Sequence, residues 1–311
     1  MIRIMAKVFA VAVALIACLQ IAPSFAQQPV AWISSTGNNA DPCTAAQPCG
    51  TFAVAASLLN AGGQISCLNS PGVIAGDQVL VISLTIDCAG LYEPFTSTGG
   101  FILDGSNQVV KIRNLTISGT DGGGFAGISL SGSGTLILEN CVLENFAGGT
   151  ALQIEPNGPL NLVIKNSRIS NNTAAGVLLK PASGGSVTAT FDGVTITNNA
   201  GGLRTDTTNG AVRVDISNST ISNNANNGVI AIGGAGGQNM VTVKNDIIAS
   251  NGQAGIEASG GNEAVLVNNA VLDSNTGGSL QAASSGRILT YQNNTVIGAV
   301  GSGFTGTAAP Q

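Results

Sequence analysis

The sequence of 311 residues predicts an all-β solenoid, a rod made of successive coils that each hold three short strands. Two observations predict this fold class: a repeat of about 26 residues and a composition that favours strands. Gly accounts for 43 residues, charged residues for 9% and aromatic residues for 4%. β-branched residues dominate while the helix formers Lys, Glu and Gln are scarce, so a helical solenoid of similar period is disfavoured.

The first 26 residues are a predicted secretory signal. Arg3 and Lys7 form its basic start, residues 8–19 are apolar, and small residues precede Gln27. The apolar run is too short for a comfortable membrane span, so no transmembrane segment is expected. The end of this run also resembles a bacterial lipoprotein box, which would leave Cys18 lipidated. Either signal predicts a secreted or periplasmic protein, and only the second predicts an anchored one.

Cleavage after Ala26 leaves five cysteines in an oxidising compartment, where disulfides form. The first two flank a proline-bearing turn and are the expected pair, and the next two, both in the first strands, can form a second. The last follows a turn of the repeat and is expected to be a buried, small hydrophobic side chain. In chain order these cysteines are Cys43, Cys49, Cys67, Cys88 and Cys141.

Residues 51–59 are amphipathic and predict a short helix that caps the N-terminal end of the solenoid. A cap is needed because an open end would expose apolar side chains and an unpaired strand edge. The first strand is expected over 62–68, and further early strands over 79–87 and 101–104. The predicted organisation is a signal (1–26), a disulfide-bearing segment (27–50), the cap helix and coils (51–304) and a tail (305–311).

From about residue 109 a pattern recurs in which two alternating apolar residues precede a turn position, with another apolar residue three places after it. A sharp bend between strands needs a left-handed backbone conformation, which Asn and Gly tolerate best. The eight turn positions are Asn114, Asn140, Asn166, Gly193, Asn218, Asn245, Asn269 and Asn293. A second column, six residues later, can form a hydrogen-bonded ladder, and both columns are expected to be structural: Asn172, Asn199, Asn224, Asn251 and Asn275.

Each copy is too short and too one-sided to fold alone, so stacking in register is needed to bury the apolar positions in one column. These repeats resemble those of right-handed parallel β-helix proteins, the pectate-lyase-like superfamily, over about residues 50–304. The resemblance implies a right-handed parallel β-helix of nine or ten coils with a short N-terminal capping α-helix.

The charge composition excludes several classes of function. The chain contains no His, so Ser-His-Asp triads, His-dependent acid–base schemes and most catalytic zinc sites are excluded. No C-x-x-C pair occurs, and no metal site is expected. Lys and Arg total 11 against 16 Asp and Glu, a net charge of −5 without a basic stripe, so nucleic-acid binding is not expected.

In polysaccharide-active members of the superfamily, the strand after the second Asn column and the loop before it carry the catalytic groups. On this strand, five polar residues are expected to face outward on three adjacent coils and to form a substrate-binding patch: Gln153, Glu155, Lys180, Arg204 and Asp206. The Asn-Thr-Asp, Asp-Asp and His-Gly motifs of polygalacturonase-like members are missing from the corresponding loops. The chain therefore resembles a secreted bacterial member without the family's catalytic motifs, and an exposed salt-bridge patch is the favoured interpretation of the five residues, ahead of a binding site and of a catalytic site.

A hydrolase is disfavoured at this patch. Glu155 and Asp206 would lie two coils apart, or ~9.6 Å, just beyond the separation of inverting carboxylates. Lys180 between them would keep both carboxylates ionised, whereas a general acid needs a raised pKa. A lyase needs less, because Lys180 or Arg204 can act as the base while Glu155 and Asp206 hold Ca²⁺ beside a uronate.

Three interpretations of function remain. The leading one is a non-catalytic extracellular or periplasmic module, without a cofactor, that binds an extended polysaccharide along the exposed sheet. The second is a polysaccharide lyase that acts on uronate polymers, the one case in which Ca²⁺ is expected. The third is a structural or adhesin-like rod. A monomer is expected in each case, and the sequence leaves the glycan and the presence of catalysis open.

Overall fold

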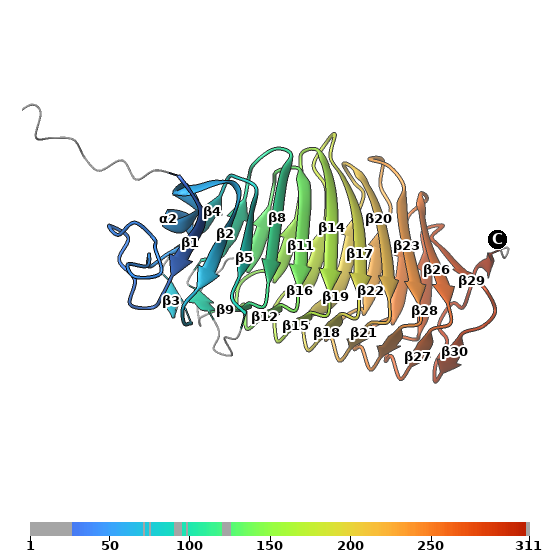
Figure 1. Ribbon diagram of the computed structural model, residues 1–311. Coiled ribbons are helices and arrows are strands. Elements are labelled where there is room, and N and C mark those ends of the chain that lie inside the picture. The colour runs from blue at the N-terminus through green and yellow to red at the C-terminus, as the bar shows by residue number, and fades with distance from the viewer. Residues whose placement is uncertain are drawn as a thin grey trace, which may run out of the picture.

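The computed structural model describes residues 27–70, 72–74, 76–89, 95–97, 99–119 and 126–308. The predicted signal over residues 1–26, Cys18 included, lies outside them. The described chain forms an elongated rod of stacked coils (Figure 1). Strands of three parallel sheets build it, with twelve strands in sheet A, ten in sheet B and nine in sheet C.

Each coil passes from sheet A through sheet B to sheet C and returns to sheet A one position further along the rod. Sheet A holds β1 (Gln28–Ile33), β2 (Leu59–Cys67), β5 (Leu84–Asp87), β8 (Gln108–Arg113), β11 (Gly134–Glu139), β14 (Pro159–Lys165), β17 (Ser186–Asp192), β20 (Ala211–Ser217), β23 (Asn239–Lys244), β26 (Glu263–Asn268), β29 (Arg287–Thr290) and β31 (Gly306–Thr307). Sheet B holds β3 (Val73–Ile74), β6 (Phe95–Ser97), β9 (Thr116–Gly119), β12 (Val142–Glu144), β15 (Arg168–Ser170), β18 (Thr195–Thr197), β21 (Thr220–Ser222), β24 (Ile247–Ala249), β27 (Val271–Asp273) and β30 (Thr295–Ile297). Sheet C holds β4 (Gln78–Leu80), β7 (Phe101–Leu103), β10 (Ile128–Leu130), β13 (Leu152–Ile154), β16 (Ala175–Leu179), β19 (Gly201–Asp206), β22 (Val229–Ile232), β25 (Ile256–Ser259) and β28 (Leu280–Ala283).

The register of the strands places the predicted apolar positions inside the coil. In sheet A, Leu136 pairs with Leu162 and Leu162 with Ala189, and all three are buried. The same alternation continues in every sheet, so the inner side chains form one hydrophobic core along the rod. The predicted all-β parallel solenoid is confirmed. The strand expected over 79–87 is divided into β4 and β5 by a turn.

The N-terminal cap is a short helix, α2 (Phe52–Ser57), as predicted. Thr51 begins it, because its side-chain oxygen accepts a hydrogen bond from the amide of Val54 at 3.4 Å. Phe52 packs edge-on against Phe95 and Phe101, with ring centroids 5.1 and 5.0 Å apart. Strand β1, which the sequence did not predict, pairs in parallel with β2 and forms the edge of sheet A.

Left-handed backbone conformations occur at the bend between sheets A and B. The first seven predicted turn positions, from Asn114 to Asn269, have φ between 47° and 66°, which confirms their role. The eighth position is wrong by one residue, because Gln292 adopts φ 65° in place of Asn293. Thr290 pairs with Val267 in sheet A, so the last coil enters its bend one residue early.

A second left-handed bend, absent from the predictions, separates sheets B and C. It lies directly before the second Asn column and has φ between 52° and 63° at Asn145, Asn171, Asn198, Asn223, Ser250 and Ser274. Asn, Ser or Gly therefore occupies both bends in the six coils that begin at β11, β14, β17, β20, β23 and β26, and these coils turn sharply at the same two corners.

The second Asn column forms a buried ladder. Both the backbone amide and Nδ2 of Asn172 donate to Oδ1 of Asn199, at 3.2 and 2.7 Å, and the pattern repeats up to Asn275. From Asn199 onward, each Nδ2 also donates to a carbonyl oxygen of the preceding coil. These polar side chains are nearly inaccessible to solvent and fully paired, which confirms their structural role.

Both predicted disulfides are present, Cys43–Cys49 and Cys67–Cys88. Cys141 is a free, buried thiol whose Sγ lies 3.3 Å from the carbonyl oxygen of Ile112. Burial raises the pKa of this thiol to about 11. It is a buried side chain of the core, as expected. No helix in the described part of the chain is both long and apolar enough to cross a membrane.

Candidate functional site

The five predicted site residues lie on three adjacent strands of sheet C or directly after them. Gln153 and Arg204 flank Leu178 in the register of β13, β16 and β19. Glu155 and Lys180 each follow the last residue of a strand, and Asp206 ends β19. The amide of Lys180 donates to the carbonyl oxygen of Ile154 at 2.9 Å, which continues the pairing beyond the strands.

Contacts within this patch run along each strand and not between strands. Nε2 of Gln153 donates to Oε2 of Glu155 at 2.9 Å, and Nη2 of Arg204 lies 3.0 Å from Oδ2 of Asp206. None of the five salt bridges found among the described residues includes Lys180. Side chains on neighbouring coils therefore lie near one another without forming one charged network.

Asp206 is buried although the alternation of β19 places it on the outer side. Its side chain is 6% exposed, and the amide and hydroxyl of Thr208 both donate to its Oδ1. Burial by itself would raise the pKa of Asp206, but hydrogen bonds from the hydroxyl and amide of Thr208 and from Arg204 lower it below its ordinary value. The carboxylate is therefore ionised and unsuited to donate a proton as a general acid.

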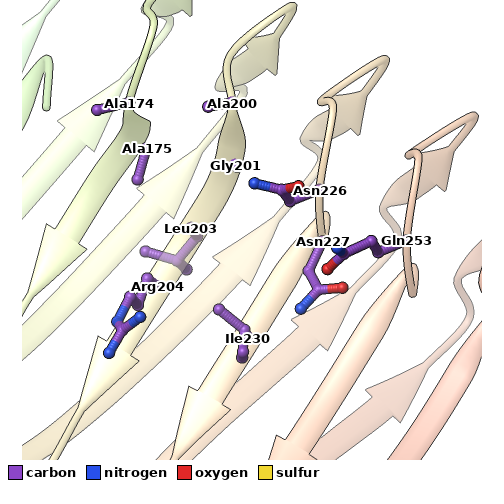
Figure 2. A pocket seen from close by; sticks show the side chains of 11 residues that line it. Ala174, Ala175, Ala200, Gly201, Leu203, Arg204, Asn226, Asn227, Ile230 and Gln253 are labelled. Carbon is purple, nitrogen blue, oxygen red and sulfur yellow. The ribbon is translucent and has the colours of Figure 1, made fainter. Parts of the chain in front are cut away.

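A groove of about 400 Å³ lies beside this patch, where sheet B turns into sheet C. Four successive coils contribute to it, so its length follows the axis of the rod over ~14 Å at ~4.8 Å per coil. Figure 2 shows the lining side chains. They are Ala174, Ala175, Ala200, Gly201, Gly202, Leu203, Arg204, Asn226, Asn227, Ile230 and Gln253, and Arg204 is the member that belongs to the predicted patch.

The groove combines small apolar side chains with three amides. Asn226 and Gln253 are exposed, whereas Asn227 is buried and held from two sides. Its Nδ2 donates to Oε2 of Glu257 at 2.8 Å, and its Oδ1 accepts from the amide of Ala254 at 2.9 Å. None of the eleven lining residues is aromatic. The surface can exchange hydrogen bonds with hydroxyl groups above a nearly flat apolar wall.

The Asn ladder lies directly behind this wall. A Cβ atom at Gly228 would come within 2.7 Å of Nδ2 of Asn251, and one at Gly255 within 2.7 Å of Nδ2 of Asn275. Real Cβ contacts are longer, so only glycine lets the strands of sheet C begin this close to the ladder. The ladder and the groove are therefore two faces of the same corner.

A Ca²⁺ site at the patch has little support from the side chains present. Oδ1 of Asp206 accepts from Thr208 and Oδ2 from Arg204, so both oxygens are already engaged. Glu155 accepts from Gln153. In the described part of the chain, no three Asp, Glu or Cys side chains are close enough together to hold a metal ion.

The sequence did not point to Asn226, Asn227 and Gln253 as groove residues. The loop at Asn226 and Asn227 lacks the polygalacturonase-like motifs, and the signal that the sequence does contain is the repeated position directly before the strands of sheet C. Read across coils, that position gathers amides and small residues on one side of the corner.

Two solved structures are among those to which this chain is similar. The pectate lyase Pel9A is 14% identical with a TM-score of 0.49, covering 92% of this chain and 80% of that chain. A GH136 lacto-N-biosidase from Eubacterium ramulus is 10% identical with a TM-score of 0.38, covering 86% and 67%. Similarity at these levels says nothing about activity, and no curated protein sequence matches the chain.

The family described as the right-handed β-helix region matches residues 99–271 and 207–309. Together the two segments cover more than half of the chain and every coil that forms the groove. The parallel coils of sheets A, B and C have the architecture that this description names. The chain belongs to the right-handed β-helix family.

Proposed function

We propose that this protein binds an extended polysaccharide in the groove at the corner of sheets B and C, without transforming it. The observation that carries the proposal is the shape of the groove, which crosses four coils and follows the rod. An extended chain can lie along such a surface and contact each of the four coils in turn, whereas a compact small molecule gains little from this length.

The chemistry of the lining supports a sugar ligand. Asn226 and Gln253 present amides that both donate and accept hydrogen bonds, as hydroxyl groups require. Ile230, Ala175 and Ala200 offer apolar surface for the C–H faces of sugar rings. Arg204 engages Asp206 through Nη2, which leaves its other N–H donors for a ligand.

We further propose that the protein acts outside the cytoplasm. Two disulfides fit an oxidising compartment, and the predicted signal over residues 1–26 would direct the chain there.

A polysaccharide lyase is a second candidate because of Lys180. This side chain is half-buried, forms no salt bridge among the described residues and lies one coil before Arg204 and Asp206. Lysine is one of the side-chain types that serve as a general base. A lyase predicts unsaturated uronate products, detected by ultraviolet absorbance, that disappear in Lys180→Ala and Arg204→Ala. If a broad panel of uronate polymers with Ca²⁺ yields none, the lyase hypothesis is wrong.

Binding is tested with the mature protein on a glycan array, followed by calorimetry on the polysaccharides that are retained. Arg204→Ala and Gln253→Ala should each weaken binding by about fivefold, the loss expected for one or two hydrogen bonds. Arg213→Ala is the matched control, because Arg213 is an exposed arginine on sheet A, 3.7 Å from its partner Asp215 and outside the groove. Equal effects of Arg204→Ala and Arg213→Ala would contradict the proposed site. If no glycan on the array is bound, the proposal of a binding module is wrong and a structural rod is the remaining interpretation.

A further inference from the structure

The groove contains one charged side chain among its eleven lining residues, Arg204. Its guanidinium is 3.0 Å from Oδ2 of Asp206, and the two side chains are 45% and 6% exposed. The carboxylate is fixed in place by Thr208, whose hydroxyl lies 2.6 Å from Oδ1. Since hydrogen bonds to its charged form lower the pKa of Asp206, this carboxylate balances the positive charge of Arg204 at neutral pH.

The surroundings of the groove add negative charge. Glu257 accepts a hydrogen bond from Asn227 on the neighbouring coil, and Glu155 directly follows β13, one coil before Lys180. Counted with Arg204 and its partner Asp206, the neighbourhood of the groove has three carboxylates (Glu155, Asp206 and Glu257) against two cations (Lys180 and Arg204). The whole chain carries −5. A net positive field steers anionic polymers to their binding sites, and an approaching polyanion meets no such field here.

The same groups remain able to recognise hydroxyls. An arginine whose charge is balanced still donates N–H bonds in a fixed planar arrangement, and Asp206 sets the direction of that plane. The amides of Asn226 and Gln253 carry no charge. From this arrangement we propose that the groove selects uncharged polysaccharides, recognised through their hydroxyl groups, over polyuronates and sulfated polymers. This inference rests on the proposed function and adds the class of ligand to it.

The test compares retention of the mature protein on neutral polymers (glucans, mannans and xylans) with retention on a polyuronate and a sulfated glycan, at low and high ionic strength. Retention on at least one neutral polymer is expected, with less than about a twofold change between the two salt concentrations, because uncharged contacts are not screened. Tighter binding to the polyuronate or sulfated glycan that weakens with salt overturns the inference and leaves the proposed function standing. Retention on no polymer overturns the proposed function and, with it, the inference.

Asp206→Asn provides a second measurement that does not depend on finding the natural glycan. The variant keeps a side-chain oxygen for Thr208 but frees the charge of Arg204, so polyuronate binding should rise by about tenfold over the wild type at low salt. Circular dichroism first establishes that the variant is folded. In a folded variant, unchanged polyuronate binding overturns the charge-balance argument. If the variant does not fold, the salt dependence of the wild type decides.

Discussion

Replacing Asn224 by Ala is expected to lower the free energy of unfolding by about 3–5 kcal/mol. Asn224 lies in the middle of the buried ladder and is used from both sides. Its Oδ1 accepts from the backbone amide and from Nδ2 of Asn199, at 3.0 and 3.1 Å. Its Nδ2 donates to Oδ1 of Asn251 at 3.0 Å and to the carbonyl oxygen of Ile196 at 3.2 Å.

The magnitude follows from the groups that lose a partner. The amide of Asn199 and the carbonyl of Ile196 are left buried without these hydrogen bonds, and each such group costs about 1–3 kcal/mol. Nδ2 of Asn199 keeps its hydrogen bond to the carbonyl oxygen of Ile169, and Oδ1 of Asn251 still accepts from the backbone amide of residue 224. These two groups therefore add little to the loss of stability. The small cavity left by the removed amide supplies the remainder.

The assay is urea unfolding of the mature protein, followed by far-ultraviolet circular dichroism. Asn161→Ala is the matched control, because Asn161 is exposed on the outer face of β14, and its effect should stay within about 0.5 kcal/mol. Asn224→Asp leaves no cavity but places a buried carboxylate oxygen against Oδ1 of Asn251 and the carbonyl oxygen of Ile196, so it should destabilise the protein at least as much as Asn224→Ala at neutral pH. A loss below about 1 kcal/mol in Asn224→Ala would refute the view that the ladder holds successive coils together.

Three further predictions concern buried titratable groups. Burial raises the pKa of Asp246 to about 6, so its contribution to the free energy of unfolding is lost as the pH rises from about 4 to 6. Asp246→Ser, which copies the hydroxyl of Ser219 one coil earlier, should remove this pH dependence, measured by urea unfolding at several pH values. Burial also raises the pKa of Glu263, although the charge of Arg287 opposes the shift, and among the described residues its two carboxylate oxygens lack a hydrogen-bond partner. Glu263→Gln should therefore stabilise the protein relative to wild type at neutral pH but not below about pH 4, and an equal effect at both would contradict this reasoning. The thiol of Cys141, with its pKa at about 11, should resist alkylation in the native protein at pH 8 and react in urea, and rapid native labelling would count against its burial.

The coils could be predicted because one constraint recurs in every repeat. A bend that needs positive φ selects Asn or Gly, so Asn114 to Asn269 reveal the period without any knowledge of the structure. The constraint weakens in the last coil, where Gln292 takes the bend although two asparagines follow it. Strand β1 escaped prediction because it lies before the repeat and is fixed by pairing with β2, a long-range interaction that no local pattern records.

The candidate site was harder to predict because alternation gives the direction of a side chain and not its accessibility. Gln153 and Arg204 occupy the expected column, yet Asp206 in the next column is buried and hydrogen-bonded to Thr208. The groove also depends on the turns before the strands, where Asn226 and Gln253 come together from separate coils. The shape of such a surface depends on the conformation of the turns, which the period of the repeat and the amino-acid composition do not determine.

The Asn ladder has a consequence for any molecule that enters the groove. The corner behind the groove is fixed by hydrogen bonds from Asn172 to Asn275, over the same coils that line it. A guest would therefore meet a contour set in advance, and little conformational entropy would be lost on association. Discrimination among ligands would depend on which ring substituents fit the fixed shape of the groove. Changes at the rim, such as Gln253, would tune affinity, whereas a side chain added at Gly228 would shift the wall itself.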